Sequence, residues 1–299
     1  MIRFSTWGMS GTIATADART EDFARERLEH WINEFDRCVN RFLATSDLSR
    51  INERGASAYV MSPTFEMVLR ASLDAADMTN GLCDPTILNA LAALGYDRDY
   101  DELASGTNDT GARADVPGVS AISYDPSRHL LDLAPGVRLD FGATAKALLS
   151  DVLVSELAPF GGVLVEVGGD VAVDGDGPDG PFVIGLATSL SVTGDEPRIS
   201  IRRGGVATSS STTRIWRHGE RVVNHVIDPR TGDCASGSLA VATVAAPSCV
   251  IANAFATAAL LWDEDAAYYI AQAGHAARLV FRDGRVDVVG GWSRDEVAA

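Results

Sequence analysis

Apolar residues recur at helical spacing in several stretches of the chain. In the stretch 21–42, one apolar stripe is formed by Leu28, Trp31, Ile32, Phe35, Val39 and Phe42. Residues three or four positions apart lie on one face of a helix, so this pattern predicts an amphipathic helix. Capping residues and glycine stops predict further helices at 63–80, 86–95, 143–157, 250–262 and 266–273.

The second half of the chain also contains short β-like runs that are separated by glycine. Such runs occur at 163–167, 181–184, 199–201 and 239–244. Near the C-terminus, Asp283-Gly284 is a typical hairpin turn between the runs 279–281 and 286–288. Another strand is predicted at 137–140. Helices and strands mix without a regular βαβ alternation, so the pattern predicts an α+β fold.

Length and charge restrict the possible functions. The chain has 299 residues, which is enough for one large domain or two modest ones. Its 25 basic and 41 acidic residues give a net charge of −16. Because polyanion binding depends on clustered Lys and Arg, this charge argues against nucleic acid or an anionic membrane surface as a partner.

The sequence indicates neither export nor membrane insertion. Residues 1–7 lack an apolar signal region, and the longest apolar stretch, 250–262, is too short to span a bilayer. The four cysteines have no CxxC spacing, which argues against a structural zinc site or a disulfide framework. We therefore expect a cytoplasmic protein.

The only lysine in the chain, Lys146, follows a predicted strand and a glycine turn. The segment 139–146 reads LDFGATAK. A junction of this kind presents free backbone N–H groups, and a lysine in the first helical turn can reach an anion held there. From spacing alone, a surface lysine beside an ordinary turn is an equally good interpretation.

Two further polar segments are candidates for chemistry. Gly168-Gly169-Asp170 ends a buried-looking strand, and paired glycines permit a positive φ or a close backbone approach, although a plain turn is commoner. A hydroxyl-rich run at 207–213 precedes His225, which stands just before a DPRTG turn. Histidine can accept a proton near neutral pH, although a lone histidine is more often structural.

Asn253 and Thr257 lie four residues apart on an otherwise apolar predicted helix. This spacing puts both oxygen-bearing side chains on one face, where they need partners if they are buried. Oxygen ligands suit Mg²⁺. Without further information, a hydrogen bond between helices is the commoner explanation.

Taken in order, these segments resemble the FAD:protein FMN transferase (ApbE) family from about Met9 to Trp262. SGT at 10–12 resembles the family's Met-Gly-Thr, and NRF at 40–42, with Ser46 and Asn52, resembles its Ser-Arg-Phe segment. The later matches are CDPT at 83–86, DFGATAKA at 140–147, GGD at 168–170, ATS at 207–209 and HVIDPRTG at 225–232. So many motifs in one order are hard to obtain by chance.

The resemblance implies an α+β, T-fold-related architecture in which 1–299 form one domain of two intertwined subdomains. It implies an enzyme that binds FAD, uses Mg²⁺ and moves FMN onto a Thr or Ser hydroxyl of an acceptor flavoprotein, releasing AMP. The implied flavin or nucleotide contacts are Ser10, Phe42, Cys83, Asp84, Pro85, Asp140, Lys146 and Val226. The implied metal ligands are the Ala143 carbonyl, Asn253 and Thr257. His225 corresponds to the base for the acceptor hydroxyl, and Lys146 would neutralise the diphosphate together with Mg²⁺.

The chain departs from the family pattern at three of these positions. Asn253 replaces a metal-binding Asp, so the site loses one negative charge and should bind Mg²⁺ more weakly. Ser10 and Cys83 replace Met and Phe, which should reshape the flavin pocket. Two alternatives remain: an FAD pyrophosphatase that uses water as the acceptor, and an FAD-binding protein without catalysis. Retention of Lys146 and His225 favours the transferase.

Overall fold

The computed structural model describes residues 1–292 except 56, 104–110, 112 and 187–195. The chain divides into two compact units built from interleaved segments. Unit 1 comprises Met1–Trp31, Lys146–Thr213 and Gly237–Ala299. Unit 2 comprises Ile32–Ala145 and Arg214–Ser236. The helix α1 (Glu21–Val39) begins in unit 1 and ends in unit 2.

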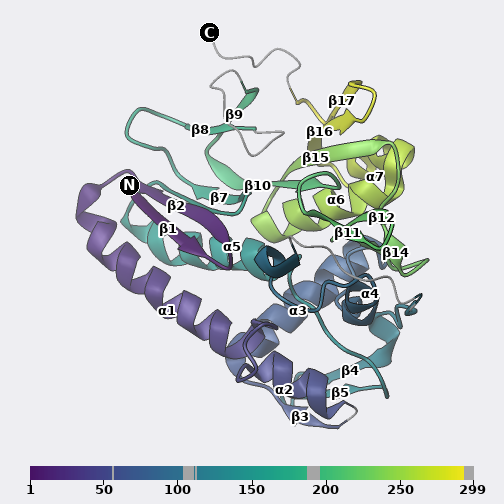
Figure 1. Cartoon of the computed structure of the whole chain (residues 1–299). Coiled ribbons are helices and arrows are strands. Elements are labelled where there is room, and N and C mark those ends of the chain that lie inside the picture. Colours follow the sequence, from purple (N-terminus) through teal and green to yellow (C-terminus); the bar gives the residue numbers. More distant parts are fainter. Residues whose placement is uncertain (56, 104–110, 112, 187–195, 293–299) are drawn as a thin grey trace. The chain divides into compact units, whose positions relative to one another are not determined.

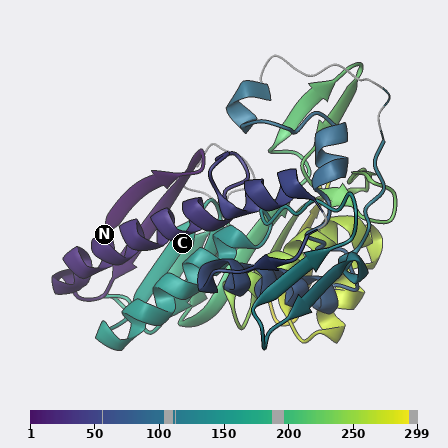
Figure 2. The same cartoon turned by 90° about the horizontal axis from the view of Figure 1, so that it is seen from below.

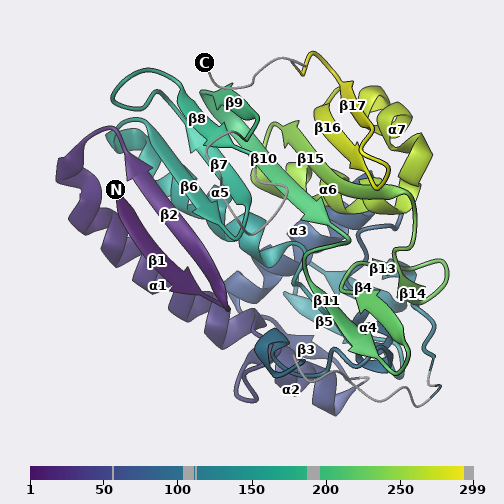
Figure 3. The same ribbon diagram turned by 45° about the horizontal axis from the view of Figure 1, so that its top comes forward.

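Unit 1 is built on an eight-stranded sheet with the order β1-β2-β6-β7-β10-β15-β16-β17 (Figure 3). The strands are β1 (Ile2–Thr6), β2 (Met9–Thr15), β6 (Val163–Val167), β7 (Asp170–Asp174), β10 (Arg203–Ser210), β15 (Leu239–Ala246), β16 (Ala276–Phe281) and β17 (Val286–Val289). All neighbours pair antiparallel. The purple β1–β2 hairpin forms one edge of this sheet (Figure 2).

Helices cover one face of the sheet in unit 1. They are α5 (Ala145–Leu157), α6 (Cys249–Trp262) and α7 (Ala266–Gln272), and α6 lies against β10 and β15 (Figure 1). Ser248 caps α6 by accepting a hydrogen bond from the Ile251 amide at 3.3 Å. A Cβ atom at Gly205 on β10 would lie 2.2 Å from the Cys249 nitrogen, so glycine allows this close approach of helix and strand.

The opposite face of the sheet is covered by the hairpin of β8 (Phe182–Gly185) and β9 (Arg198–Ile201). The buried cluster on that side consists of Val171, Val173, Phe182, Leu186, Val206 and Trp292. Since side chains alternate along a strand, Asp170 and Ala172 of β7 face the helices instead. This alternation gives Asp170 a buried position on the helical side of the sheet.

Besides the end of α1, unit 2 contains three helices and three small sheets among its described residues. The helices are α2 (Asp47–Arg54), α3 (Pro63–Met78) and α4 (Leu88–Ala93). The strands are β3 (Tyr59–Val60), β4 (Ile122–Asp125) and β5 (Leu130–Leu133), ordered β3-β5-β4, and the pairs β11 (Ile215–His218) with β12 (Arg221–Asn224) and β13 (Ile227–Asp228) with β14 (Asp233–Cys234). Short 3₁₀ helices lie in the two units at Ala18–Thr20, Tyr100–Leu103, Val119–Ala121, Ala158–Phe160 and Asp263–Asp265.

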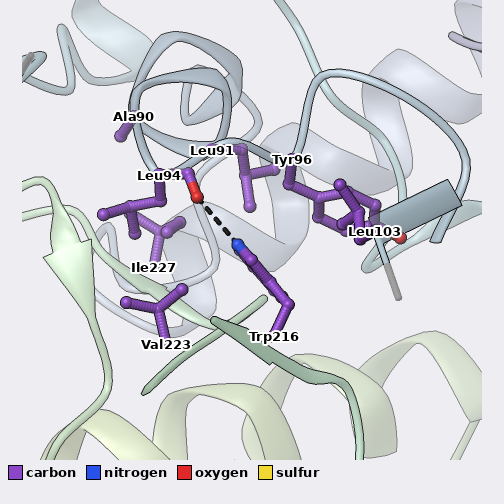
Figure 4. Packing of buried hydrophobic residues seen from close by; sticks show 8 residues of the cluster. All are labelled: Ala90, Leu91, Leu94, Tyr96, Leu103, Trp216, Val223 and Ile227. Atoms are coloured by element: carbon purple, nitrogen blue, oxygen red, sulfur yellow. Dashed lines mark hydrogen bonds between the residues drawn. The ribbon is translucent and has the colours of Figure 1, made fainter. Parts of the chain in front are cut away.

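An apolar cluster joins the two sequence segments of unit 2 (Figure 4). Leu91, Leu94 and Tyr96 come from the first segment, and Trp216 and Val223 from the second. The indole nitrogen of Trp216 donates to the Leu94 carbonyl oxygen at 2.8 Å, so the ring's polar atom is satisfied inside the core.

The α+β prediction is confirmed, and each predicted helix has a counterpart. The strand predicted at 137–140 is wrong. The backbone of Leu139 bonds with both its N–H and its C=O to the Asn52 side chain, at 2.7 and 2.8 Å, and the Asp140 amide donates to the Pro85 carbonyl at 2.8 Å. These partners take the place of a sheet ladder.

The first helix ends at Val39, before Phe42, because the Asn40 side chain accepts the Phe42 amide hydrogen bond at 3.0 Å.

Within the described part of the chain, the helices are too short or too polar to cross a bilayer.

Candidate functional site

Asp170 is the centre of a polar group in unit 1. It is 1% exposed and begins β7 directly after the Gly168-Gly169 turn. One carboxylate oxygen, Oδ2, lies 3.2 Å from Nζ of Lys146 on α5. The other, Oδ1, accepts a hydrogen bond of 3.0 Å from Nδ2 of Asn253 on α6. Three motifs that are far apart in the sequence therefore meet at one buried carboxylate.

The glycine pair before Asp170 lets the chain turn tightly next to β2. Gly168 has a φ of +60°, and a Cβ atom there would lie 2.5 Å from the sulfur of Met9. The Gly168 amide donates to the Ser10 carbonyl at 3.0 Å, so the predicted contact Ser10 adjoins this turn. The Gly169 amide donates to Glu166 Oε1 at 2.8 Å, while burial raises the pKa of Glu166.

Asn253 has a fixed amide orientation. A carboxylate has no proton to donate, so the NH₂ group of Asn253 must face Asp170 and its carbonyl oxygen must point elsewhere. That oxygen is buried and has no hydrogen-bond partner within the described residues. One turn further along α6, the hydroxyl of Thr257 lies 3.2 Å from the Ser209 hydroxyl. The polar face predicted for this helix therefore exists.

The oxygen atoms on this face fit a hard cation. A buried amide oxygen without a partner costs free energy unless a donor or a cation reaches it, and Mg²⁺ prefers oxygen ligands. Asn253 and Thr257 offer such oxygens. In the described ranges, no three His, Cys, Asp or Glu side chains cluster closely enough to hold a metal. A cation here would therefore depend on amide, hydroxyl and carbonyl oxygens with few carboxylates.

Asp151 joins the two helices that carry these side chains. From α5, its two oxygens accept the Cys249 and Val250 amides of α6 at 2.8 and 2.9 Å. A carboxylate is favourable at a helix N-terminus, where amides lack intrahelical partners. Burial nevertheless raises the pKa of Asp151. Asp151 is not among the candidates from the sequence, since nothing in its local pattern distinguishes it from a surface acid.

Asp140 is the centre of a second polar group, in unit 2. Its Oδ2 lies 2.6 Å from Nε of Arg41, and its Oδ1 accepts the Gly142 amide at 2.8 Å. Its backbone amide bonds to Pro85, as described above. Three predicted site segments, around residues 42, 85 and 140, are thus brought together. Both oxygens of Asp140 are already engaged within the protein.

Arg41 is held on several sides. It donates to the Tyr96 carbonyl oxygen at 3.1 Å, and its guanidinium carbon lies 4.1 Å from the ring centre of Phe42 and 4.6 Å from that of Tyr96. These are cation–π distances. Phe42 as a whole residue is still 41% exposed, so this predicted flavin contact lies at the surface.

The CDPT segment forms a compact turn. Asp84 Oδ1 accepts hydrogen bonds from both the amide and the hydroxyl of Thr86, at 2.7 and 2.6 Å. The Thr86 hydroxyl in turn accepts the Gly118 amide at 3.0 Å. Cys83 is buried, and burial raises the pKa of its thiol to about 12, with a smaller contribution from Asp84. The thiol is therefore neutral and inert near neutral pH.

His225 stands between β12 and β13 and is half-buried. Asn224 fixes the turn around it, since its side chain accepts the Val226 amide at 3.0 Å and donates to the Ala235 carbonyl at 2.8 Å. Val226 is buried. The imidazole is thus carried by a rigid turn next to the apolar cluster of unit 2.

Each unit therefore holds part of the predicted site. Unit 1 contains Ser10, Lys146, Asn253 and Thr257. Unit 2 contains Phe42, Cys83, Asp84, Pro85, Asp140, Ala143, His225 and Val226. In the sequence, Asp170 stands out only as part of a glycine turn. Its motif was the available signal, but its contacts with α5 and α6 become visible only in the fold.

Comparison with known proteins gives consistent matches. The family model described as "ApbE family" matches residues 8–280. A FAD:protein FMN transferase from Haemophilus influenzae is 24% identical over 269 residues, covering 86% of this chain and 78% of the relative. One from Rhodobacter capsulatus is 27% identical over 248 residues, covering 80% of this chain and 47% of the relative.

Solved structures share the fold. An ApbE protein from Thermotoga maritima superimposes with a TM-score of 0.84 at 22% identity, covering 96% of both chains. The apo flavinyl transferase ApbE from Pseudomonas stutzeri gives a TM-score of 0.78 at 22% identity, covering 96% of this chain and 92% of that one.

Proposed function

Because the chain belongs to the ApbE family, whose model it matches over residues 8–280, we propose that it is an FAD:protein FMN transferase. In the proposed reaction, a Thr or Ser hydroxyl oxygen of an acceptor flavoprotein attacks the phosphorus on the FMN side of FAD. The bond between this phosphorus and the bridging oxygen breaks, AMP leaves with that oxygen, and the hydroxyl proton passes to a base. FMN remains attached through a phosphoester.

The polar group around Asp170 is the main structural support for this proposal. A diphosphate carries negative charge, and a protein with a net charge of −16 must bring local cations to it. The side chain of Lys146 is 22% exposed, so its ammonium group can contact a bound ligand while it remains paired with Asp170. Its role in the proposal is to neutralise charge that develops on the phosphoryl oxygens.

Asn253, Thr257 and the carbonyl of Ala143 are proposed to hold Mg²⁺. When bound, Mg²⁺ supplies a Lewis acid that offsets the charge of the diphosphate oxygens. The buried, unpartnered oxygen of Asn253 supports this assignment.

His225 is proposed to accept the proton of the acceptor hydroxyl. A hydroxyl is a weak nucleophile until a base removes its proton, and imidazole is the side chain whose ordinary pKa suits this near neutral pH. The hydrogen bonds of the Asn224 side chain hold the backbone turn that carries His225. Phe42 offers exposed aromatic surface for a flavin ring, and Ser10, Cys83, Asp84, Pro85, Asp140 and Val226 are proposed to line the remaining contacts.

Purified protein, FAD, MgCl₂ and an acceptor flavoprotein test the proposal. AMP measured by chromatography and covalent flavin on the acceptor measured by intact mass should appear together. Replacing the acceptor threonine by alanine should remove both products. AMP without acceptor, at an equal rate, would instead indicate an FAD pyrophosphatase. Tight FAD binding without any AMP would indicate a binding protein.

A further inference from the structure

Asp170 is given no role at the metal in the assignments above, yet it is hydrogen-bonded to Asn253, one of the proposed metal ligands. It is 1% exposed and bonds to Nδ2 of Asn253 at 3.0 Å. A charge this deeply buried is costly unless it is paired, and Lys146 provides one partner at 3.2 Å. The chain therefore maintains a buried ion pair at this position.

The two orphan oxygens of the group are the second observation. Within the described residues, Asp170 Oδ2 and Asn253 Oδ1 are both buried without a hydrogen-bond partner. The ammonium of Lys146 balances the charge of Oδ2 but does not meet hydrogen-bond geometry. Buried oxygens without a hydrogen-bond partner call for an explanation, and a bound cation is one that oxygens of this kind fit.

The neutral ligands alone make a poor magnesium site. Asn253 and Thr257 carry no charge, whereas Mg²⁺ in proteins is usually bound through one or two carboxylates. A carboxylate at position 253 would stand within 3.0 Å of Asp170, and the two charges would repel each other. The amide at 253 relieves this repulsion and leaves a single charge on the pair.

Building on the proposed function, we infer that Asp170 supplies the negative charge of the Mg²⁺ site in this chain. Asn253 then has two roles: its NH₂ group orients Asp170, and its oxygen faces the cation. The charge that the amide at position 253 lacks is carried by its hydrogen-bonded neighbour. Asp170 and Asn253 act as one pair with one carboxylate.

Calorimetric titration with MgCl₂ alone tests the inference without depending on activity. Asp170→Asn should weaken Mg²⁺ binding by about 10-fold or more, as loss of a group hydrogen-bonded to a metal ligand typically does. The exchanged variant Asp170→Asn with Asn253→Asp keeps one carboxylate and one amide in contact, and it should bind within about threefold of wild type. Asp174→Asn is the matched control, because it removes the same charge from the same strand at a position paired with Arg203.

Each outcome decides the inference. Wild-type affinity in Asp170→Asn would overturn it, and so would an exchanged variant as weak as the single one. If Asp170→Asn does not fold, the exchanged variant still tests the pair, because its circular dichroism and its Mg²⁺ affinity are both measurable. Covalent flavin transfer by a wild-type protein that binds no Mg²⁺ would overturn this inference and leave the transferase proposal standing. Mg²⁺ binding that depends on Asp170, in a protein that transfers no flavin, would overturn the transferase proposal and leave this inference standing.

Discussion

The guanidinium of Arg41 and the carboxylate of Asp140 form a nearly buried ion pair, with Nε and Oδ2 2.6 Å apart. Their side chains are only 11% and 7% exposed. Asp140 also holds the turn that leads to α5, through the Gly142 amide. The pair thus connects the residues just after α1 with the segment that precedes Lys146.

Arg41→Gln should lower the free energy of unfolding by about 3–5 kcal/mol, because it leaves the Asp140 carboxylate buried without its charged partner. Urea unfolding followed by circular dichroism measures this change. Arg98→Gln is the control, since its pair with Asp97 is 51% exposed on both sides and should contribute at most about 1 kcal/mol. Equal losses of unfolding free energy in the two variants would show that the buried pair contributes no more to stability than the exposed pair.

Lys146 should be the only lysine that acetylation can modify, because the chain contains no other. Acetylation removes the positive charge, so we expect AMP release to fall by about 10²–10³-fold, the usual effect of losing one stabilising group in a transition state. Saturating FAD should slow the modification. Peptide mapping by mass spectrometry separates Lys146 from the N-terminal amine.

Lys146→Arg provides the control for this experiment, since it keeps a positive charge but offers no lysine to the reagent. Whatever activity this variant has should survive acetylation. A wild-type protein that is fully acetylated at Lys146 and remains fully active would contradict the proposed role.

Local sequence signals predicted most helices because each depends on neighbouring residues. Ser248 as an N-cap and Pro63 at a helix start work within one turn of the chain. The helix α2 was missed, although Ser46 caps it by accepting the Ser49 amide at 3.0 Å, because its eight residues give too short an apolar pattern.

Contacts between distant residues explain what the sequence could not predict. Asn52 bonds to Leu139 across 87 positions, and this side chain replaces the strand expected at 137–140. Asn253 meets Asp170 across 83 positions. Motif order pointed to the segments that contain Lys146, Asp170 and Asn253, but it could not show that a turn aspartate would become the partner of the other two.

His225→Ala should abolish transfer while FAD binding is retained. A general base contributes about 10²–10⁴-fold to the rate, so kcat should fall by that factor with little change in the Kd for FAD. Stopped assays of covalent flavin and a fluorescence titration of FAD measure the two quantities. His129→Gln is the control, because His129 is an exposed histidine that bonds to Glu66 at 2.6 Å in another part of unit 2. Comparable kcat losses in both variants would argue against His225 as the base.

Cys83 should make the protein less stable at alkaline pH. Burial raises the pKa of its thiol from 9.0 to about 12. Between these values the unfolded chain releases a proton that the folded chain retains, so rising pH favours unfolding by about 1.4 kcal/mol per unit. The contribution of this neutral thiol is fully present below pH 9 and is lost as the pH rises toward 12.

Cys83→Ala removes this titration, so the urea midpoint of the variant should fall less steeply than that of wild type between pH 9 and pH 11. The two curves should be parallel below about pH 8, where the thiol is protonated in both states. That region serves as an internal control, because any loss of packing from the smaller side chain shifts the whole curve by a constant amount. The buried Cys249 keeps a raised pKa in both proteins, so its contribution cancels in the difference. Curves that stay parallel up to pH 11 would mean that the folded protein ionises Cys83 as readily as the unfolded chain, which burial next to Asp84 does not permit.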